Sequence, residues 1–443
     1  MNITVEKQPD CLAKLTAEVP ADSVEKTRSE IMKAYAKEAK IPGFRPGKAP
    51  AKVIAKRYQK EIGEELEMRL IRQATEGGIQ QEELRAVEVK RPEKFEFNDD
   101  GSLSLVTEVI LAPDIELPEY KGVEVKVESE EVTDEDMENA ITQLQERHAE
   151  YTDVDDRGAE TGDIAVITYK TTQDGKPLDE AVGKPVGFIS GREGFWVKIQ
   201  EGAFLPGFTE ELVGLKTGEE KDITLTLPED FPVEDLRGVE VVFATKLDTI
   251  KQQTLPELND EFANKIAEGK SMDEVKDLLR ENVAQQKTRH IGEQKVQQIL
   301  EKVVGGVECE LPQLLVDREA QGIANQMVQQ AQQRGAKADD LKGQEEEILG
   351  NAREQARQNL KTNFVLQEIA QKEKVELQQQ DVIQRIVQIA QQQNKKPEDL
   401  MKELQKNNQI PAIQNQVLIG KTIDFLINEA KVEIVAADEL PTE

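Results

Sequence analysis

Aromatic side chains are scarce in residues 249–443, and this scarcity is the strongest constraint that the sequence places on the fold. The segment contains three Phe, no Tyr and no Trp, and it is rich in Gln, Glu, Lys, Ala, Leu and Ile. Ser271 with Glu274 can cap the start of a helix and Gly305–Gly306 can end one, so we expect long amphipathic helices. Such helices cannot pack around a large aromatic core, and part of their apolar surface should remain exposed.

Aromatic residues are instead concentrated in residues 161–247. Alternating apolar runs at 164–170, 222–229 and 239–246, separated by Gly and Pro turns, predict a compact, mostly β domain. Its bulky aromatic residues are Tyr169, Phe188, Phe195, Trp196, Phe204, Phe208, Phe231 and Phe243. From the residues alone, these rings could fill a small core or line an apolar pocket that binds a proline ring.

The first 115 residues mix strand and helix patterns. Alternation near residues 3–19 and 103–109 predicts strands, a helix can start at Ser23, and a second helix is expected from Pro50 to a break at Gly77–Gly78. An acidic connector follows, in which Thr133 and Asp136 resemble a capping box. We therefore expect a multidomain α+β protein with an α+β domain, a connector, a β domain and a long-helix domain, at residues 1–115, 116–160, 161–247 and 248–443.

Composition excludes several classes of protein. Two Cys (Cys11, Cys309) and two His (His148, His290) argue against a disulfide framework or a His/Cys metal cage, and we expect them to be structural or solvent-facing. No phosphate loop, nucleophile elbow or zinc helix motif occurs, so we expect no metal and no cofactor. The absence of an apolar leader or of a run of 18 apolar residues indicates a soluble, cytoplasmic protein without membrane contact.

Charge is distributed unevenly along the chain. The formal net charge is −30, of which residues 1–115 contribute −2 and residues 116–443 contribute −28. The whole surface therefore cannot coat a nucleic acid, and any RNA contact must be local. Residues 31–60 are the exception, because they hold nine basic residues and one acid. This basic stretch could be a solvated helix hairpin or a contact with phosphate groups.

A stiff loop lies at the centre of that basic stretch. In Ile41–Pro50, two prolines flank Phe44 and Arg45 and restrict the backbone, while two glycines permit tight turns. The loop would present an aromatic ring and a guanidinium at its tip, which is typical of a contact with a partner. The residues that we assign to this contact are Gly43, Phe44, Arg45, Pro46, Gly47 and Lys48.

These six residues resemble the ribosome-docking signature of the trigger factor family, the ribosome-associated bacterial chaperones, and the order of the predicted domains matches along essentially the whole chain. The resemblance implies docking at the exit tunnel of the large ribosomal subunit, through contacts with protein and RNA. It further implies an FK506-binding-protein-type prolyl isomerase domain with an antiparallel β sheet, and helical arms that hold unfolded nascent polypeptides. Whether the free protein forms a homodimer is left open.

The resemblance also implies which residues form the isomerase pocket. Phe231 falls where that family usually has Tyr, so it lacks a hydroxyl that could donate to the substrate carbonyl, and Leu178 replaces an aromatic residue. We therefore expect peptide binding with isomerase activity that is weak. The matched positions are Tyr169, Leu178, Asp179, Phe195, Phe204, Leu205, Phe208, Phe231 and Phe243.

The combined interpretation is an ATP-independent, ribosome-associated chaperone that shields nascent chains and is also a peptidyl-prolyl cis-trans isomerase. One alternative is a prolyl isomerase whose helices mainly dimerise it. A second alternative is a structural coiled-coil scaffold, which the absence of sustained heptads in the sequence disfavours.

Overall fold

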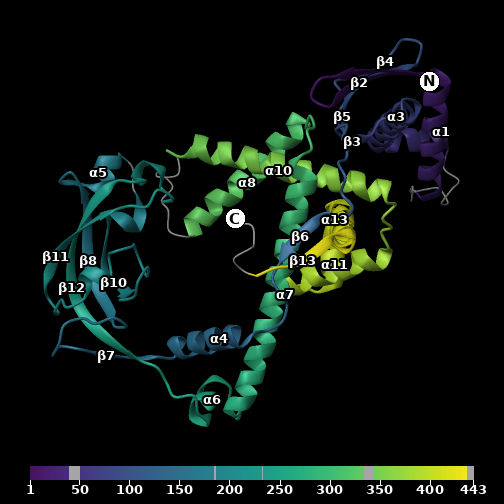
Figure 1. Ribbon diagram of the computed structural model, residues 1–443. Coiled ribbons are helices and arrows are strands. Elements are labelled where there is room, and N and C mark those ends of the chain that lie inside the picture. Colours follow the sequence, from purple (N-terminus) through teal and green to yellow (C-terminus); the bar gives the residue numbers. More distant parts are fainter. Residues whose placement is uncertain (39–49, 184–185, 232, 334–342, 437–443) are drawn as a thin grey trace. The chain divides into compact units, whose positions relative to one another are not determined.

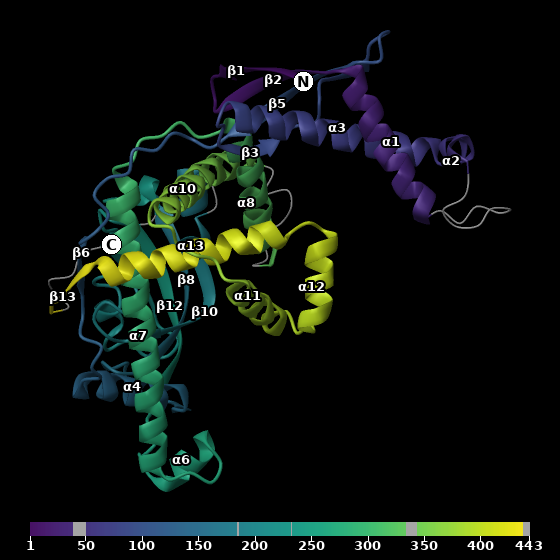
Figure 2. The same ribbon diagram turned by 90° about the vertical axis from the view of Figure 1, so that its right-hand side faces the viewer.

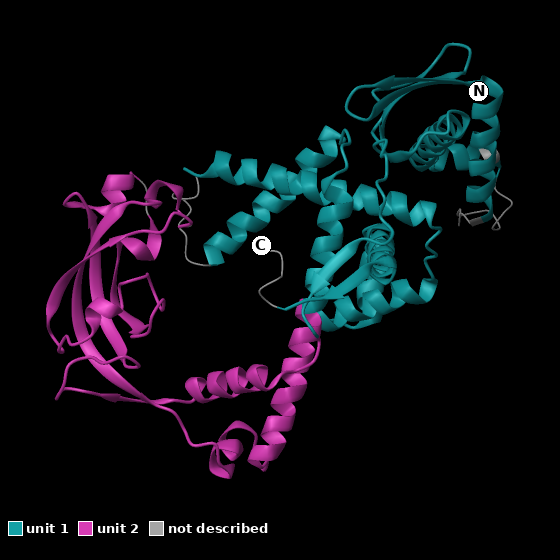
Figure 3. Cartoon of the chain, viewed as in Figure 1, with its two compact units in different colours: residues 1–129, 291–443 teal, residues 130–290 magenta. Residues whose placement is uncertain are grey.

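The computed structural model describes residues 1–38, 50–183, 186–231, 233–333 and 343–436 of the chain. Two compact units are formed, as the two colours of Figure 3 show. Unit 1 comprises residues 1–129 and 291–443, and unit 2 comprises residues 130–290. The long helix α7, Met272–Gly305, contributes to both units and ends at the glycine predicted to stop it.

Unit 1 begins with an antiparallel sheet in the order β1-β2-β5-β3, with β4 also paired to β5. The central strand β2 alternates strictly between buried and less buried residues, as expected for a sheet with one covered face. Its strands are β1 (Asn2–Gln8), β2 (Leu12–Val19), β3 (Ala86–Val89), β4 (Lys94–Phe97) and β5 (Leu103–Leu111).

Three helices belong to this part of unit 1: α1 (Ala21–Glu38), α2 (Ala51–Arg57) and α3 (Gln59–Gln81). Apolar residues of α1 and α3 pack with the sheet in one cluster, and Figure 1 shows both helices beside the strands. The predicted break at Gly77–Gly78 was wrong, because α3 continues through both glycines. A Cβ atom on Gly78 would lie 2.5 Å from Leu15 Cδ1, so this glycine permits close packing of the helix on the sheet.

The C-terminal part of unit 1 is helical, as expected. Its apolar residues form separate small clusters, one of which packs α8 against α10 mainly through Val316, Ala320, Ala324, Ala352 and Ala356. No described helix is long and apolar enough to cross a membrane. The further helices are α8 (Gln313–Gln333), α10 (Glu345–Lys372), α11 (Gln379–Gln392), α12 (Pro397–Lys406) and α13 (Ile410–Glu429).

A two-stranded parallel sheet joins distant parts of unit 1. Strand β6, Glu124–Val127, pairs with β13, Lys431–Ile434, which follows directly after α13. Figure 2 shows the two strands side by side at the end of that helix. Val125 and Val127 of β6 are buried, whereas all four residues of β13 are exposed.

Unit 2 contains the β domain. Its sheet has the order β10-β8-β12-β11, and the long strand β12 also pairs with β7. All of these pairs are antiparallel, as predicted. The strands are β7 (Glu150–Asp153), β8 (Ile164–Gln173), β9 (Lys176–Pro177), β10 (Gly191–Lys198), β11 (Glu220–Thr226) and β12 (Glu240–Thr254).

Helix α4, Asp134–Arg147, starts with the predicted capping box. The backbone N–H of Asp136 donates to Thr133 Oγ1 over 3.1 Å, and the N–H of Thr133 donates to Asp136 Oδ2 over 2.8 Å. Lys287 Nζ of α7 also donates to Asp136 Oδ2 over 2.7 Å, and these hydrogen bonds lower the pKa of Asp136 to about 2. The helix α6, Asp260–Ile266, lies between β12 and α7 in the chain.

A partly buried ion pair between Arg157 and Asp163 lies directly before β8. Arg157 donates to both carboxylate oxygens of Asp163, over 2.5 and 3.0 Å, and the Glu160 backbone N–H donates to the same carboxylate over 2.9 Å. Asp163 is buried, and the hydrogen bonds from Arg157 keep the pKa of its carboxyl below the ordinary value of 3.8.

Asp163→Asn should lower the free energy of unfolding of the β domain by about 2 kcal/mol at pH 7, because it removes the charge of the carboxylate that accepts two Arg157 hydrogen bonds. Glu160, 3.8 Å from Arg157, is exposed and compensates for this loss only in part. The pKa of Asp163 is lowered in the folded state, so the ion pair stabilises fully above the unfolded-state pKa and is lost as pH falls through the folded-state pKa. The difference between variant and wild type should therefore shrink toward pH 3. Urea unfolding followed by the fluorescence of Trp196, the single Trp of the chain, measures this domain.

The matched control is Asp222→Asn on β11, where the side chain is exposed. We expect a change within about 0.5 kcal/mol for this variant. An Asp163→Asn effect that is equal at pH 7 and pH 3 would contradict the assigned role of the ion pair.

Candidate functional site

Aromatic rings from three strands and one loop meet inside the β domain. Tyr169 of β8 lies at the centre, with its ring centroid 5.9 Å from Phe195, 5.8 Å from Phe204, 6.5 Å from Phe208 and 5.7 Å from Phe243. These separations are within the range in which tilted and edge-to-face rings attract each other. We call these five residues, together with Phe188, the aromatic cluster.

The positions assigned to the isomerase pocket differ in their exposure. Phe195, Phe204 and Phe231 are only partly buried, so part of each ring faces solvent. Asp179 is exposed. The buried positions are Tyr169, Leu178, Leu205, Phe208 and Phe243. All of the apolar positions belong to one packed cluster, which combines the core of the domain with a partly exposed aromatic surface.

Phe188 was not predicted as a site residue, but the structure places it at this surface. It lies in the short helix η1, Gly187–Ser190, its side chain is 56% exposed, and its ring centroid is 6.3 Å from that of Phe204. The available sequence signal was an apolar pair, Phe188–Ile189, bracketed by Gly187 and Gly191. Gly187 has a φ of 71°, which favours glycine and allows the turn.

The polar groups of the site hold backbone in place. The Tyr169 hydroxyl donates to the Phe188 carbonyl over 2.7 Å, and burial raises the pKa of Tyr169. Asp179, in the short helix α5 (Leu178–Val182), accepts from the Val186 backbone N–H over 2.9 Å. Tyr169 and Asp179 thus position η1 from its two sides.

The chemistry available here is binding by apolar contact. Partly exposed rings can hold a proline side chain away from water, and rotation about an X–Pro bond needs no proton transfer, metal or covalent step. The barrier of about 18–20 kcal/mol comes from amide resonance, which a dry site can weaken by binding the twisted bond more tightly than the planar one.

The residues assigned to the second site, Gly43, Phe44, Arg45, Pro46, Gly47 and Lys48, lie outside the residues that the structure describes. The described ends of the flanking helices α1 and α2 carry exposed basic side chains. These are Lys33, Lys37, Lys52, Lys56 and Arg57. The basic stretch therefore does present charge to solvent on both sides of the loop.

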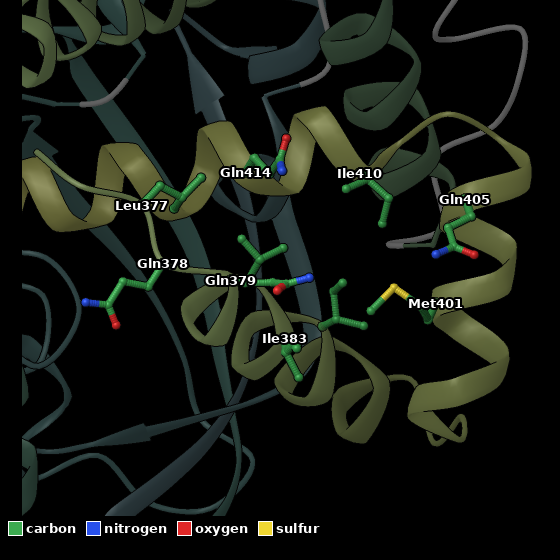
Figure 4. A pocket seen from close by; sticks show the side chains of 10 residues that line it. Leu377, Gln378, Gln379, Ile383, Met401, Gln405, Ile410 and Gln414 are labelled. Carbon is green, nitrogen blue, oxygen red and sulfur yellow. The ribbon is translucent and has the colours of Figure 1, made fainter.

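A third candidate surface lies among α11, α12 and α13. A pocket of about 420 Å³ is lined there by apolar side chains and glutamine amides, and Figure 4 shows Met401, Gln405 and Ile410 around a common space. The lining residues are Leu377, Gln378, Gln379, Val382, Ile383, Ile386, Met401, Gln405, Ile410 and Gln414. Flexible Met and Gln side chains suit contact with apolar segments of varied sequence.

Comparisons with known proteins agree with these observations. The family model described as bacterial trigger factor protein matches residues 1–144, the one for its C-terminus matches residues 271–428, and an FKBP-type peptidyl-prolyl cis-trans isomerase model matches residues 155–248. A protein of Akkermansia muciniphila named Trigger factor is 42% identical over 98% of this chain and 99% of its own length. Proteins of the same name from Halothermothrix orenii and Opitutus terrae are 32% and 30% identical, over 96% and 98% of this chain and 99% of each relative.

Tyr169→Phe should lower the free energy of unfolding of the β domain by about 1 kcal/mol, because the hydrogen bond to the Phe188 carbonyl is lost. Urea unfolding followed by Trp196 fluorescence measures this change. Tyr151→Phe on β7 is the control, since Tyr151 is exposed and should tolerate loss of its hydroxyl within about 0.5 kcal/mol. Equal effects of the two substitutions would show that the Tyr169 hydroxyl does not anchor η1.

Proposed function

Because the chain belongs to the trigger factor family, we propose that it docks at the exit tunnel of the large ribosomal subunit through Phe44 and Arg45. It is a ribosome-associated chaperone that interacts with nascent chains and has an FKBP-type peptidyl-prolyl cis-trans isomerase domain. The observation that supports this most is the order of the three matched segments along one chain, which spans nearly the full length of its relatives.

Within this proposal, each part of the chain has its own task. Residues 1–115 bind the ribosome, residues 116–160 connect, residues 161–247 bind prolyl peptides, and residues 248–443 shield nascent chains. The protein acts in the cytoplasm without a nucleotide cofactor. It binds its clients through many weak contacts, so they can dissociate without an energy source. Nascent chains need apolar surface to bind to. The C-terminal helices, which have few aromatic residues in their core, and the pocket among α11, α12 and α13 supply that surface.

The proposed isomerase site is the aromatic cluster with Leu178, Asp179, Leu205 and Phe231. Phe231 is partly buried against the hydrophobic core of the β domain and lacks a hydroxyl, so it cannot donate a hydrogen bond to a substrate carbonyl. We therefore propose that turnover is slow relative to peptide binding.

The alternative of a prolyl isomerase whose helices mainly dimerise it has no support. Residues 271–428, which include most of the helical part, themselves match the C-terminal part of the trigger factor family.

Replacing both Phe44 and Arg45 by Ala should weaken co-sedimentation with ribosomes about 30-fold, because an aromatic residue and an Arg at a contact tip each contribute strongly to binding. The control is the pair Arg91→Ala and Phe97→Ala, which removes the same two residue types from exposed positions in the same N-terminal domain. If the Phe44/Arg45 variant binds as well as wild type does, ribosome docking through this loop is wrong.

Phe204→Ala should lower kcat/KM for a prolyl tetrapeptide at least tenfold, while suppression of aggregation of an unfolded protein stays within about twofold of wild type. Phe188→Ala, at an exposed position, should lower kcat/KM by about threefold without affecting folding. Val213→Ala, which alters an exposed apolar residue elsewhere in this domain, is the control. Loss of aggregation suppression in parallel with isomerase activity would favour the isomerase-first alternative.

A further inference from the structure

The parallel sheet of β6 and β13 has two outer edges. Side chains of α7 make hydrogen bonds with the backbone groups of the edge on β6. Gln298 accepts from the Lys126 backbone N–H over 3.0 Å and donates to the Lys126 carbonyl over 2.6 Å. Lys302 Nζ donates to the Glu124 carbonyl over 2.7 Å. Side chains of α7 therefore occupy the backbone groups of β6 that face away from β13, and this edge is closed to another strand.

The other edge, on β13, pairs with no further strand among the described residues of unit 1. The backbone N–H groups of Lys431 and Val435 donate to the Val123 and Val127 carbonyls over 2.9 and 3.0 Å. Because successive residues of a strand point their backbone groups in opposite directions, the N–H and C=O groups of Val432 and Ile434 point away from β6. Within the described part of unit 1, no hydrogen bond is made to these outward groups.

The side chains on β13 are also accessible. Val432 is 44% exposed and Ile434 is 69% exposed, and both are β-branched residues that pack well against a neighbouring strand. Unpaired backbone groups next to exposed apolar side chains form a template for one further strand.

We propose that the outer edge of β13 binds an extended segment of an unfolded polypeptide by strand addition. This inference rests on the proposed chaperone function, and it names one way in which a client is held. The edge forms hydrogen bonds with the backbone of the client, so it can bind many sequences. The bound segment must be extended and have no proline at the paired positions. Since β13 has four residues, the added strand is short and its binding is readily reversible.

Charge favours a foreign segment over a second copy of the chain. Each copy has a formal net charge of −30, so pairing two copies at their β13 edges brings two strongly acidic molecules together. A neutral or basic extended segment meets no such repulsion.

The probe is an acetylated ten-residue peptide of alternating Val and Lys, labelled for fluorescence anisotropy and titrated with the full-length protein. Val432→Pro removes the outward N–H of β13 but leaves the N–H groups of Lys431 and Val435 in place, so we expect at least a fivefold loss of affinity. Val432→Thr keeps both the N–H and a β-branched side chain, and its affinity should stay within twofold of wild type.

A second measurement does not depend on the folding of the proline variant. The same peptide, N-methylated at every residue so that neither edge has donors, should bind wild type at least fivefold more weakly. Hydrogen exchange at Val432 and Ile434 should slow when the unmethylated peptide is added. Equal binding of both peptides, or unchanged exchange at these two amides, would overturn strand addition at β13.

Two parallel measurements separate this proposal from the proposed function. Aggregation suppression and ribosome co-sedimentation by wild type test the chaperone function itself, and their failure would overturn that function. If both succeed while the peptide results fail, only strand addition is overturned. A dimer of the free protein that sedimentation detects and Val432→Pro abolishes would identify a second copy as the occupant and would also overturn the proposal.

Discussion

The scarcity of aromatic rings limits how thick a core the C-terminal helices of unit 1 can build. The α8–α10 contact depends largely on alanines, which let two helices approach closely but bury little area per residue. The α11–α13 region has its own small cluster, and a pocket remains between its helices. Thin, separate cores leave helix faces available, and a chaperone that must contact varied unfolded segments needs such faces.

The β domain of unit 2 follows the opposite rule. Its rings are gathered around Tyr169, and the few polar groups among them, the Tyr169 hydroxyl and the Asp179 carboxylate, hold backbone N–H and C=O groups of the η1 region. Isomerisation of a prolyl bond requires a shaped apolar surface and no proton donor or acceptor of matched pKa. The polar side chains are therefore free to serve the architecture of the site.

Local patterns predicted much of this fold because their causes are local. The capping box of Thr133 and Asp136 and the stop at Gly305 are set by neighbours in the chain, and both were confirmed. Gly78 misled the prediction because its role is tertiary: in helix α3 it leaves room for Leu15 of strand β2, and no helix pattern in the sequence shows this contact.

The candidate site shows the same division. Aromatic residues concentrated in residues 161–247 were visible in the sequence, and the structure brings most of them together around one ring. Phe188 was missed because its place depends on a hydrogen bond from Tyr169, 19 residues away in the chain. Phe208 is buried whereas Phe204 is only partly buried. This difference in exposure depends on packing against several strands, so the sequence around each Phe does not predict it.

The ties between the chain and helix α7 also have a mechanical consequence. In unit 1, Gln298 and Lys302 hold strand β6, and in unit 2, Lys287 donates to the Glu131 carbonyl and to Asp136. The segment that leaves unit 1 is therefore clamped to the same helix shortly before and shortly after the boundary between the units. A force that pulls the chain from Asp136 onward therefore loads these hydrogen bonds to α7 before it reaches the strands of the N-terminal sheet.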